Sequence, residues 1–376
     1  MIFTNIQLES FRNYDLLDRE IKDRLLILQG PNGSGKSNLL EALYVLNAAQ
    51  SFRTQDIKEV IQTGKEFSLL RGSCLDSIEV QHTIQMKIPR SGRRTVHKDG
   101  QYVPSLPSQG LCGSIVVFSS RDHRIVSGEP AMRRSYLDNE IPLLSGQYGA
   151  ALDAYKKTVE QKNKLLKDER IPPAVKRDSL GVWNQQLVEY GARVVVGRLR
   201  FLVQVRPLVA RYYQELAVEE ANLGIRYVSR TPFTEGITEP DAAQLLREEL
   251  EANLEREIVI GQAIRGPHRD DVMLSIHGKE ARDYASEGQV RSLAICLKLA
   301  VRDLVSSQNQ EDPVLLVDDI GGELDPERQD RAVRLLGAKG QVVVATQDPE
   351  AYQVGLAEWA GEMQVWAISN GTVVDV

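Results

Sequence analysis

Cysteine is scarce in this chain. Cys74, Cys112 and Cys296 are its three cysteines in 376 residues, and no two of them have CxxC spacing. Their odd number and wide separation argue against a disulfide framework and against a zinc site. We therefore expect reduced thiols, as in a cytoplasmic protein.

Long apolar runs are also missing. No window approaches the roughly 18 uninterrupted apolar residues that a membrane-spanning helix needs. The N-terminal sequence MIFTNIQLESFRNY alternates apolar and polar residues and already carries Glu9 and Arg12. This pattern is typical of a strand and lacks the apolar core of a signal peptide. The sequence thus predicts neither a membrane span nor export.

Positive charge is in slight deficit, because 46 lysines and arginines face 52 aspartates and glutamates, for a net charge of −6. This balance argues against a surface that is basic everywhere. It leaves nucleic-acid binding open, since a local basic patch can supply the phosphate contacts. The hydrophobic fraction of 42% and charged fraction of 26% are those of an ordinary globular protein.

The chain has the order α/β, helical insertion, α/β. Residues 67–118 contain several strand-like runs, with KDG at 98–100 as a hairpin turn, and residues 126–254 have helical spacing. Pro172, Pro173 and Pro207 are expected to interrupt the helices of the insertion. We therefore expect one α/β head from residues 1–125 and 255–376, with an antiparallel β subdomain at about 67–118 and a mainly helical lobe at 126–254.

The strongest motif is a phosphate loop that follows an apolar strand and opens a helix. It consists of Gly30, Pro31, Asn32, Gly33, Ser34, Gly35, Lys36 and Ser37. In such a loop backbone N–H groups surround the β-phosphate, the lysine adds charge, and the final hydroxyl can ligate Mg²⁺. The sequence therefore predicts binding of ATP and magnesium.

A second motif is the apolar strand VLLVDD at 314–319, which ends in two carboxylates. Asp318 is placed to hold Mg²⁺, and Asp319 to polarise an attacking water. Many buried strands end in an acidic turn, so this motif indicates a metal site only in combination with the phosphate loop.

A third motif, Ser286-Glu287-Gly288-Gln289, precedes an amphipathic helix. One interpretation is a plain N-cap serine. The other is a signature that binds the γ-phosphate held by a second subunit, because it stands about 25 residues before VLLVDD, the order found in ATP-binding-cassette heads. On the second interpretation Ser286, Gly288 and Gln289 act in trans, and the protein dimerises with ATP.

The motifs together resemble the RecF family of bacterial recombination-mediator ATPases, which is related to SMC heads and ABC cassettes. The matching segments are FRNY (11–14), GPNGSGKSNLLEAL (30–43), SFRT (51–54), GEPAMRRSYLD (128–138), GPHRDD (266–271), SEGQ (286–289) and DDIGGELD (318–325). The resemblance covers essentially the whole chain. It implies an ABC/SMC-type P-loop ATPase head that dimerises with ATP and hydrolyses it slowly.

The resemblance also implies roles for single residues. Arg12 and Asn13 would lie near the nucleotide, and Asp319 would take the catalytic position beside Lys36. Glu323, Leu324 and Asp325 would form a dimer-contacting loop. The sequence has no switch histidine after the terminal strand, so the γ-phosphate sensor would be Thr346 or Gln347, or would be absent.

Basic residues gather in a few segments that could contact DNA. Arg90, Arg93 and Arg94 lie in a hairpin, and Arg193, Arg200 and Arg211 share one helical face. A solvated helix face is the alternative for each group. The family resemblance implies sequence-independent binding of duplex DNA near single-strand gaps, and action with RecR and RecO to load RecA. The rival interpretation is the ATPase subunit of a transporter.

Overall fold

The computed structural model describes residues 1–107, 109–219, 221–318, 324–337, 340–347, 349–350 and 363–375. They form two compact units. The first comprises residues 1–122, 212–219 and 291–376, and the second comprises residues 123–211 and 220–290. Among the helices of the described residues, none combines the length and apolar character needed to cross a bilayer.

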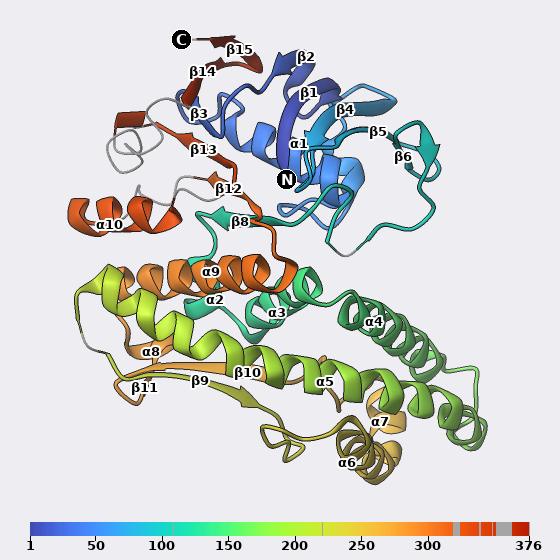
Figure 1. The fold of residues 1–376 in the computed structure, drawn as a ribbon. Helices are drawn as coiled ribbons and strands as arrows, with labels where there is room; N and C mark the ends of the chain where they lie inside the picture. The colour runs from blue at the N-terminus through green and yellow to red at the C-terminus, as the bar shows by residue number, and fades with distance from the viewer. Residues whose placement is uncertain are drawn as a thin grey trace. The chain divides into compact units, whose positions relative to one another are not determined.

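A mainly parallel sheet forms the centre of the first unit (Figure 1). Its order is β15 (Thr372–Asp375), β14 (Met363–Ser369), β3 (Leu25–Gln29), β13 (Val342–Thr346), β12 (Val314–Asp318) and β8 (Ile115–Ser119), and β15 runs antiparallel to its neighbour. The residues of β12 and β13 are almost all fully buried, as expected for strands covered on both faces. The carboxyl ends of β3, β13 and β12 therefore meet at one edge.

An antiparallel sheet forms the second layer of this unit. Its order is β2 (Tyr14–Glu20), β1 (Ile2–Phe11), β4 (Phe67–Leu75), β5 (Gln81–Pro89), β6 (Thr95–Lys98) and β7 (Gln101–Tyr102). Helix α1 (Lys36–Ala48) contacts β12 and β13 of one sheet and β1, β4 and β5 of the other. Its leucines and Ala42 are buried, because a sheet covers the helix on each of two sides.

Further helices of the first unit lie within its described residues. They are the short 3₁₀ helix η1 (Ile57–Val60), α10 (Pro326–Leu336) and the greater part of α9 (Glu287–Asn309). Asp325 caps α10, since its carboxylate accepts a hydrogen bond from the backbone N–H of Arg328 at 2.9 Å.

The second unit is built from helices around a small sheet. Its elements are α2 (His123–Ser127), α3 (Pro130–Leu144), α4 (Gly146–Lys167), most of α5 (Pro173–Ala217), β9 (Leu223–Val228), α6 (Glu239–Ala252), α7 (Leu254–Ile260), β10 (Asp271–Ile276), β11 (Lys279–Glu280) and α8 (Ala281–Tyr284). The sheet has the order β11-β10-β9, and α3 packs against β10.

Two expectations about the division of the chain differ from this architecture. The second unit extends to residue 290 and not to 254, because β10 pairs along its whole length with β9, inside the inserted lobe. The antiparallel sheet was expected within residues 67–118, but it also includes β1 and β2 from the N-terminus. Residues 115–119 instead form β8 of the parallel sheet.

Pro207 does not interrupt its helix, contrary to the sequence-based expectation, since α5 continues through it to Ala217. A proline removes one hydrogen bond and strains one turn, at a cost of about 3 kcal/mol. Buried residues on both sides of it, including Val205, Val209 and Tyr213, hold α5 together through their packing. The burial of several such side chains stabilises the helix by more than the proline destabilises it. The sequence pattern reveals the proline but not this packing.

The cysteine expectation is wrong for one pair. Cys74 and Cys112 form a disulfide, with their Cα atoms 6.7 Å apart. Cys74 lies on β4, and Cys112 is held by Asn47 at the end of α1, whose side-chain oxygen accepts the Cys112 N–H at 3.0 Å. The two residues meet because α1 packs on β4, which a separation of 38 residues does not reveal. Cys296 is buried and unpaired among the described residues.

A fully buried ion pair joins two helices of the second unit. The Lys162 ammonium on α4 lies 2.5 Å from the Glu257 carboxylate on α7, and both side chains are 0% exposed. Asn184 accepts a second hydrogen bond from Lys162 at 2.7 Å, and the Ile264 N–H donates to Glu257 at 2.8 Å. Burial lowers the pKa of Lys162, against the opposing effect of Glu257. Each buried charge is therefore stabilised by the opposite charge and not by water.

Lys162→Ala should destabilise the second unit by about 3–5 kcal/mol, because it leaves the Glu257 carboxylate buried without a counter-charge. Lys164→Ala is the matched control on the same helix, since Lys164 pairs with Glu160 on the surface and both side chains are 63% exposed. It should leave the free energy of unfolding nearly unchanged. Urea unfolding followed by circular dichroism measures both, and equal destabilisation by the two variants would contradict this account of the pair.

Candidate nucleotide site

The phosphate loop connects β3 to α1. Gly33 and Gly35 have φ angles of 78° and 120°, which L side chains rarely adopt. A Cβ at Gly35 would stand 2.7 Å from the Asn13 side chain, so no larger residue fits. The Ser34 hydroxyl is buried and makes no hydrogen bond within the described part of the chain. Such an unsatisfied polar atom inside a loop of backbone N–H groups suits an anionic ligand.

Lys36 and Ser37 lie at the start of α1. The Lys36 ammonium donates to the carbonyl oxygens of Gly30 and Pro31 at 2.6 and 2.9 Å. The Ser37 hydroxyl donates to the Asp318 carboxylate at 2.6 Å, across 281 residues of sequence. A hydroxyl and a carboxylate oxygen are hard donors of the kind that Mg²⁺ accepts. The structure thus joins the two residues that the sequence predicts as metal ligands.

The FRNY segment supports the loop from outside. The Asn13 amide donates to the Ser34 carbonyl at 3.0 Å, and the Tyr14 hydroxyl donates to the Gly35 carbonyl at 3.0 Å. Asn38 on α1 donates in turn to Asn13 at 2.8 Å. Asn13 therefore lies at the loop, and its role is to hold the backbone of the loop.

Arg12 and Arg53 converge on one buried carboxylate. Arg12 binds Glu41 through two hydrogen bonds of 2.9 and 2.8 Å, and Arg53 lies 3.4 Å from the same carboxylate, which is 0% exposed. Arg53 also donates to Asn38 at 2.5 Å. Because two guanidinium groups share one carboxylate, the cluster carries an excess positive charge next to the residues that hold the loop. This excess favours a polyanion in the loop.

A hairpin turn that sequence reasoning missed completes the support. Asn370 and Gly371 connect β14 to β15 with φ angles of 47° and 76°. The Gly371 N–H donates to the Ser34 carbonyl at 3.0 Å, and a Cβ at Gly371 would lie 2.1 Å from the Asn13 carbonyl oxygen. The Asn-Gly pair is a signal for a two-residue hairpin turn, but nothing local places that turn on the phosphate loop.

The residues proposed to sense the γ-phosphate lie at the end of β13, where Thr346 is the last residue of the strand and Gln347 follows it. Thr346 is 2% exposed and lies opposite Gln29, the last residue of β3. Gln347 is more exposed, and its amide donates to the Asn32 side chain at 2.5 Å. Gln347 therefore contacts the phosphate loop directly.

The signature motif forms a capping box at the start of α9. The Gln289 N–H donates to the Ser286 hydroxyl at 3.3 Å, and the Ser286 N–H donates to the Gln289 side chain at 3.0 Å. Ser286 is exposed, and Gly288 lies in the first turn of the helix. The N-cap interpretation is confirmed, and a role in trans stays a prediction. Leu324 and Asp325 are described, whereas Asp319 and Glu323 lie outside the described residues.

The arginines proposed to contact DNA have different surroundings. Arg90 donates to the carbonyl oxygens of Lys65 and Gln62, whereas Arg93 and Arg94 are exposed at the tip of the β5–β6 hairpin. Arg193 lies 3.1 Å from Glu189 and 3.9 Å from Glu239. Arg200 and Arg211 are exposed on α5. Arg93, Arg94 and Arg200 are therefore better placed than Arg90 or Arg193 to meet a phosphate.

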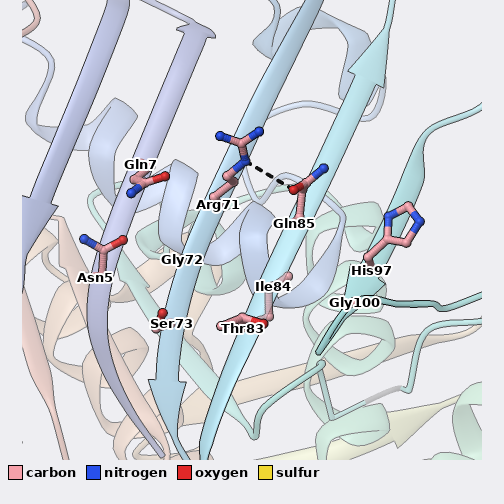
Figure 2. A pocket seen from close by; sticks show the side chains of 10 residues that line it. All are labelled: Asn5, Gln7, Arg71, Gly72, Ser73, Thr83, Ile84, Gln85, His97 and Gly100. Carbon is pink, nitrogen blue, oxygen red and sulfur yellow. Dashed lines mark hydrogen bonds between the residues drawn. The ribbon is translucent and has the colours of Figure 1, made fainter.

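The open face of the antiparallel sheet carries a polar depression of about 500 Å³. Figure 2 shows Asn5 and Gln7 from β1, Arg71 from β4, Gln85 from β5 and His97 from β6 on this face. Arg71 donates to Gln85 at 3.2 Å. The lining offers mostly uncharged donors and acceptors, so this face by itself is not a phosphate-binding surface.

A phosphate loop held between two sheets, with a hydroxyl–carboxylate pair at the sheet edge, defines a P-loop ATPase head of the ABC and SMC type. The model of the RecF/RecN/SMC N-terminal domain matches residues 2–364. The DNA replication and repair protein RecF of Limosilactobacillus reuteri is 33% identical over 351 residues, which cover 92% of each chain. That of Bacillus subtilis is 31% identical over 379 residues and covers 100% of each chain. The chain belongs to the RecF family.

Solved structures agree with this assignment. A structure of the recombination mediator protein RecF-ATPrS in the RecFOR pathway is 28% identical, with a TM-score of 0.87, and covers 100% of this chain and 98% of its own. An SMC head bound to the C-terminal winged-helix domain of ScpA is 13% identical, with a TM-score of 0.53, and shows the shared fold alone.

Gly371→Ala should weaken ATP binding by about tenfold or more, a loss of about 1.4 kcal/mol, because the added methyl group displaces Asn13 from the phosphate loop. Gly64→Ala is the matched control, since Gly64 has a φ of 83° and nothing within 4 Å of its Cβ position. Both variants carry the same backbone strain. Titration with a fluorescent ATP analogue measures the difference, and equal affinities would refute the role of the hairpin turn.

Proposed function

We propose that the protein is an ATP-switched DNA-binding protein of recombinational repair and replication restart. ATP and Mg²⁺ bind at the phosphate loop and join two copies of the chain. The closed dimer holds duplex DNA near a single-strand gap, and slow hydrolysis releases it. The hydrogen bond between Ser37 and Asp318 carries the proposal, because it brings two oxygen ligands of the kind that Mg²⁺ prefers together at the phosphate loop.

Each residue of the site has a defined task in this proposal. Gly30 to Ser37 hold the triphosphate, and Ser37 and Asp318 hold Mg²⁺, which neutralises phosphate charge when bound. Asp319 orients the attacking water, and Thr346 or Gln347 responds to the γ-phosphate. Ser286, Gly288 and Gln289 of the second copy complete the site. Glu323, Leu324 and Asp325 contact the opposite copy.

The names of related proteins support the proposed protein partners. A structure of RecF-ATP is described as belonging to the RecFOR pathway, and the curated relatives are DNA replication and repair proteins. We therefore propose RecR and RecO as partners in loading RecA. The transporter alternative has less support, since these relatives match along nearly the whole chain.

Sedimentation with and without ATP tests the dimer. The wild-type protein should sediment as a dimer with ATP and Mg²⁺, because the signature motif of each copy is needed to complete the nucleotide site of the other copy. Ser286→Arg should bind the nucleotide yet stay monomeric, since the bulky cation blocks the approach of the second phosphate loop. Ser307→Arg is the control, an exposed serine at the other end of α9. Dimers of Ser286→Arg would show that the signature does not act in trans.

DNA binding is tested by its salt dependence. Arg93→Gln combined with Arg94→Gln should weaken binding and reduce the slope of log K against log salt by about 0.9 for each DNA phosphate that the arginines neutralise. Arg200→Gln tests the α5 face in the same way. Lys22→Gln is the control, an exposed lysine that already faces Glu20 at 3.9 Å. Unchanged slopes in all variants would remove these arginines from the DNA-binding surface.

A further inference from the structure

The segment GPHRDD at 266–271 connects the helices of the second unit. Gly266 has a φ of 116°, and a Cβ there would lie 2.4 Å from the Tyr155 hydroxyl on α4. The Pro267 carbonyl accepts from Arg198 on α5 at 2.7 Å. Asp271 receives two hydrogen bonds of 2.8 Å from Arg133 on α3. One short segment thus fixes three helices, which accounts for its dense polar composition.

His268 in this segment is a neutral structural residue. Its Nε2 lies 3.3 Å from the Ala263 carbonyl and must donate to it, so Nδ1 accepts from the Tyr155 hydroxyl at 2.7 Å. Burial lowers the pKa of His268 to about 4. The imidazole therefore adds no charge near neutral pH, and both of its nitrogens are occupied. A metal or catalytic role for His268 is not supported.

A pocket of about 300 Å³ opens beside this segment, entirely within the second unit. Its lining comes from one face of α3, one face of α4, α5 and the segment itself. The polar lining residues are Arg134, Ser135, Asp138, Asn139, Tyr155, Lys156, Arg198 and His268. Sequence motifs that are distant along the chain therefore form one cavity.

The balance of charge in the pocket is positive. Among the described residues that line it, Asp138 is the one carboxylate, and both of its oxygens are engaged, by Arg198 at 2.8 Å and by Lys156 at 2.9 Å. The carboxylate of Asp270, which is not among the lining residues, accepts a hydrogen bond from the Tyr227 hydroxyl at 2.7 Å. Three cations of the lining, Arg134, Lys156 and Arg198, thus share one lining carboxylate, Asp138.

Arg134 is a cation of this pocket that forms no ion pair within the described part of the chain. Its neighbour Arg133 has the Asp271 carboxylate, but Arg134 makes one hydrogen bond, to the Asp270 carbonyl at 2.9 Å, and no ion pair with any described residue. Burial lowers its pKa, and Arg198 and Arg269 repel it while Asp271 and Asp138 attract it from a distance. A half-buried guanidinium in this position gains free energy when an anion enters the pocket.

We propose that this pocket binds a phosphate group, with Arg134 and Lys156 as its charged ligands and Ser135 and Asn139 as its neutral ones. A guanidinium presents a planar fork of donors that matches phosphate oxygens, and the ammonium, hydroxyl and amide add donors from other directions. The phosphate can belong to a small phosphorylated molecule or to the end of a nucleic-acid strand, because both offer the same terminal group.

Calorimetric titration of the full chain with inorganic phosphate tests the pocket. Wild-type protein should bind phosphate, and Arg134→Gln and Lys156→Gln should each weaken this binding by tenfold or more. Lys157→Gln is the matched control, because Lys157 is exposed on α4, adjacent to Lys156, and does not line the pocket. It should bind as the wild type does.

The phosphate loop is a second place where phosphate can bind, and Lys36→Ala separates the two. Binding that persists in Lys36→Ala, and that weakens by tenfold or more when Arg134→Gln is added to Lys36→Ala, supports the pocket. Binding that is abolished in Lys36→Ala and unchanged in Arg134→Gln overturns the proposal, as does the absence of any phosphate binding. A shared circular dichroism spectrum and melting curve for Arg134→Gln and Lys157→Gln excludes misfolding as the cause.

Oligonucleotides with a 5′-phosphate or a 5′-hydroxyl distinguish the sources in the Lys36→Ala background. Tighter binding of the phosphorylated strand that disappears in Arg134→Gln assigns the pocket to a strand end. Equal binding of both strands, together with Arg134-dependent binding of inorganic phosphate, assigns it to a small phosphorylated molecule.

Discussion

The hydrogen bond between Ser37 and Asp318, at 2.6 Å, depends on the alignment of three parallel strands. Thr346 of β13 lies opposite Gln29 of β3, and Ala345 lies opposite Asp318 of β12. This register brings the ends of β3, β13 and β12 to one edge of the sheet, where the phosphate loop leaves β3. A slip of one residue would turn each buried side chain to the other face, so the same apolar packing that stabilises the sheet also aligns the site.

The phosphate loop is held from the antiparallel sheet as well as from the parallel one. Asn13 and Tyr14, near the β1–β2 turn, bind its carbonyl oxygens, and the Gly371 N–H of the β14–β15 turn binds Ser34. These interactions use carbonyl groups of the loop and occupy none of its backbone N–H groups, of which that of Ser34 donates within the loop, to the Pro31 carbonyl at 3.3 Å. The loop is thereby preorganised for an anion, which lowers the conformational cost of binding.

Local patterns in the sequence predicted the parts of this structure that local physics determines. The phosphate loop, the apolar strand before Asp318 and the KDG turn, with Asp99 and Gly100 at φ angles of 51° and 76°, belong to this group. Pairings between distant segments were not predictable, because periodicity indicates which face of a strand is buried and not which strand lies beside it. The β9–β10 pair and the Cys74–Cys112 disulfide are examples.

The capping box at Ser286 does not compete with a role in binding phosphate. A serine hydroxyl has one proton and two lone pairs, and the cap uses a lone pair to accept from the Gln289 N–H. The proton stays available to donate to an anion, and the exposed position of Ser286 leaves it accessible. The first turn of α9 adds backbone N–H groups and the positive end of the helix dipole. The plain cap and the proposed nucleotide-binding signature are therefore compatible with one geometry, because the order of the helix start is what directs its free donors.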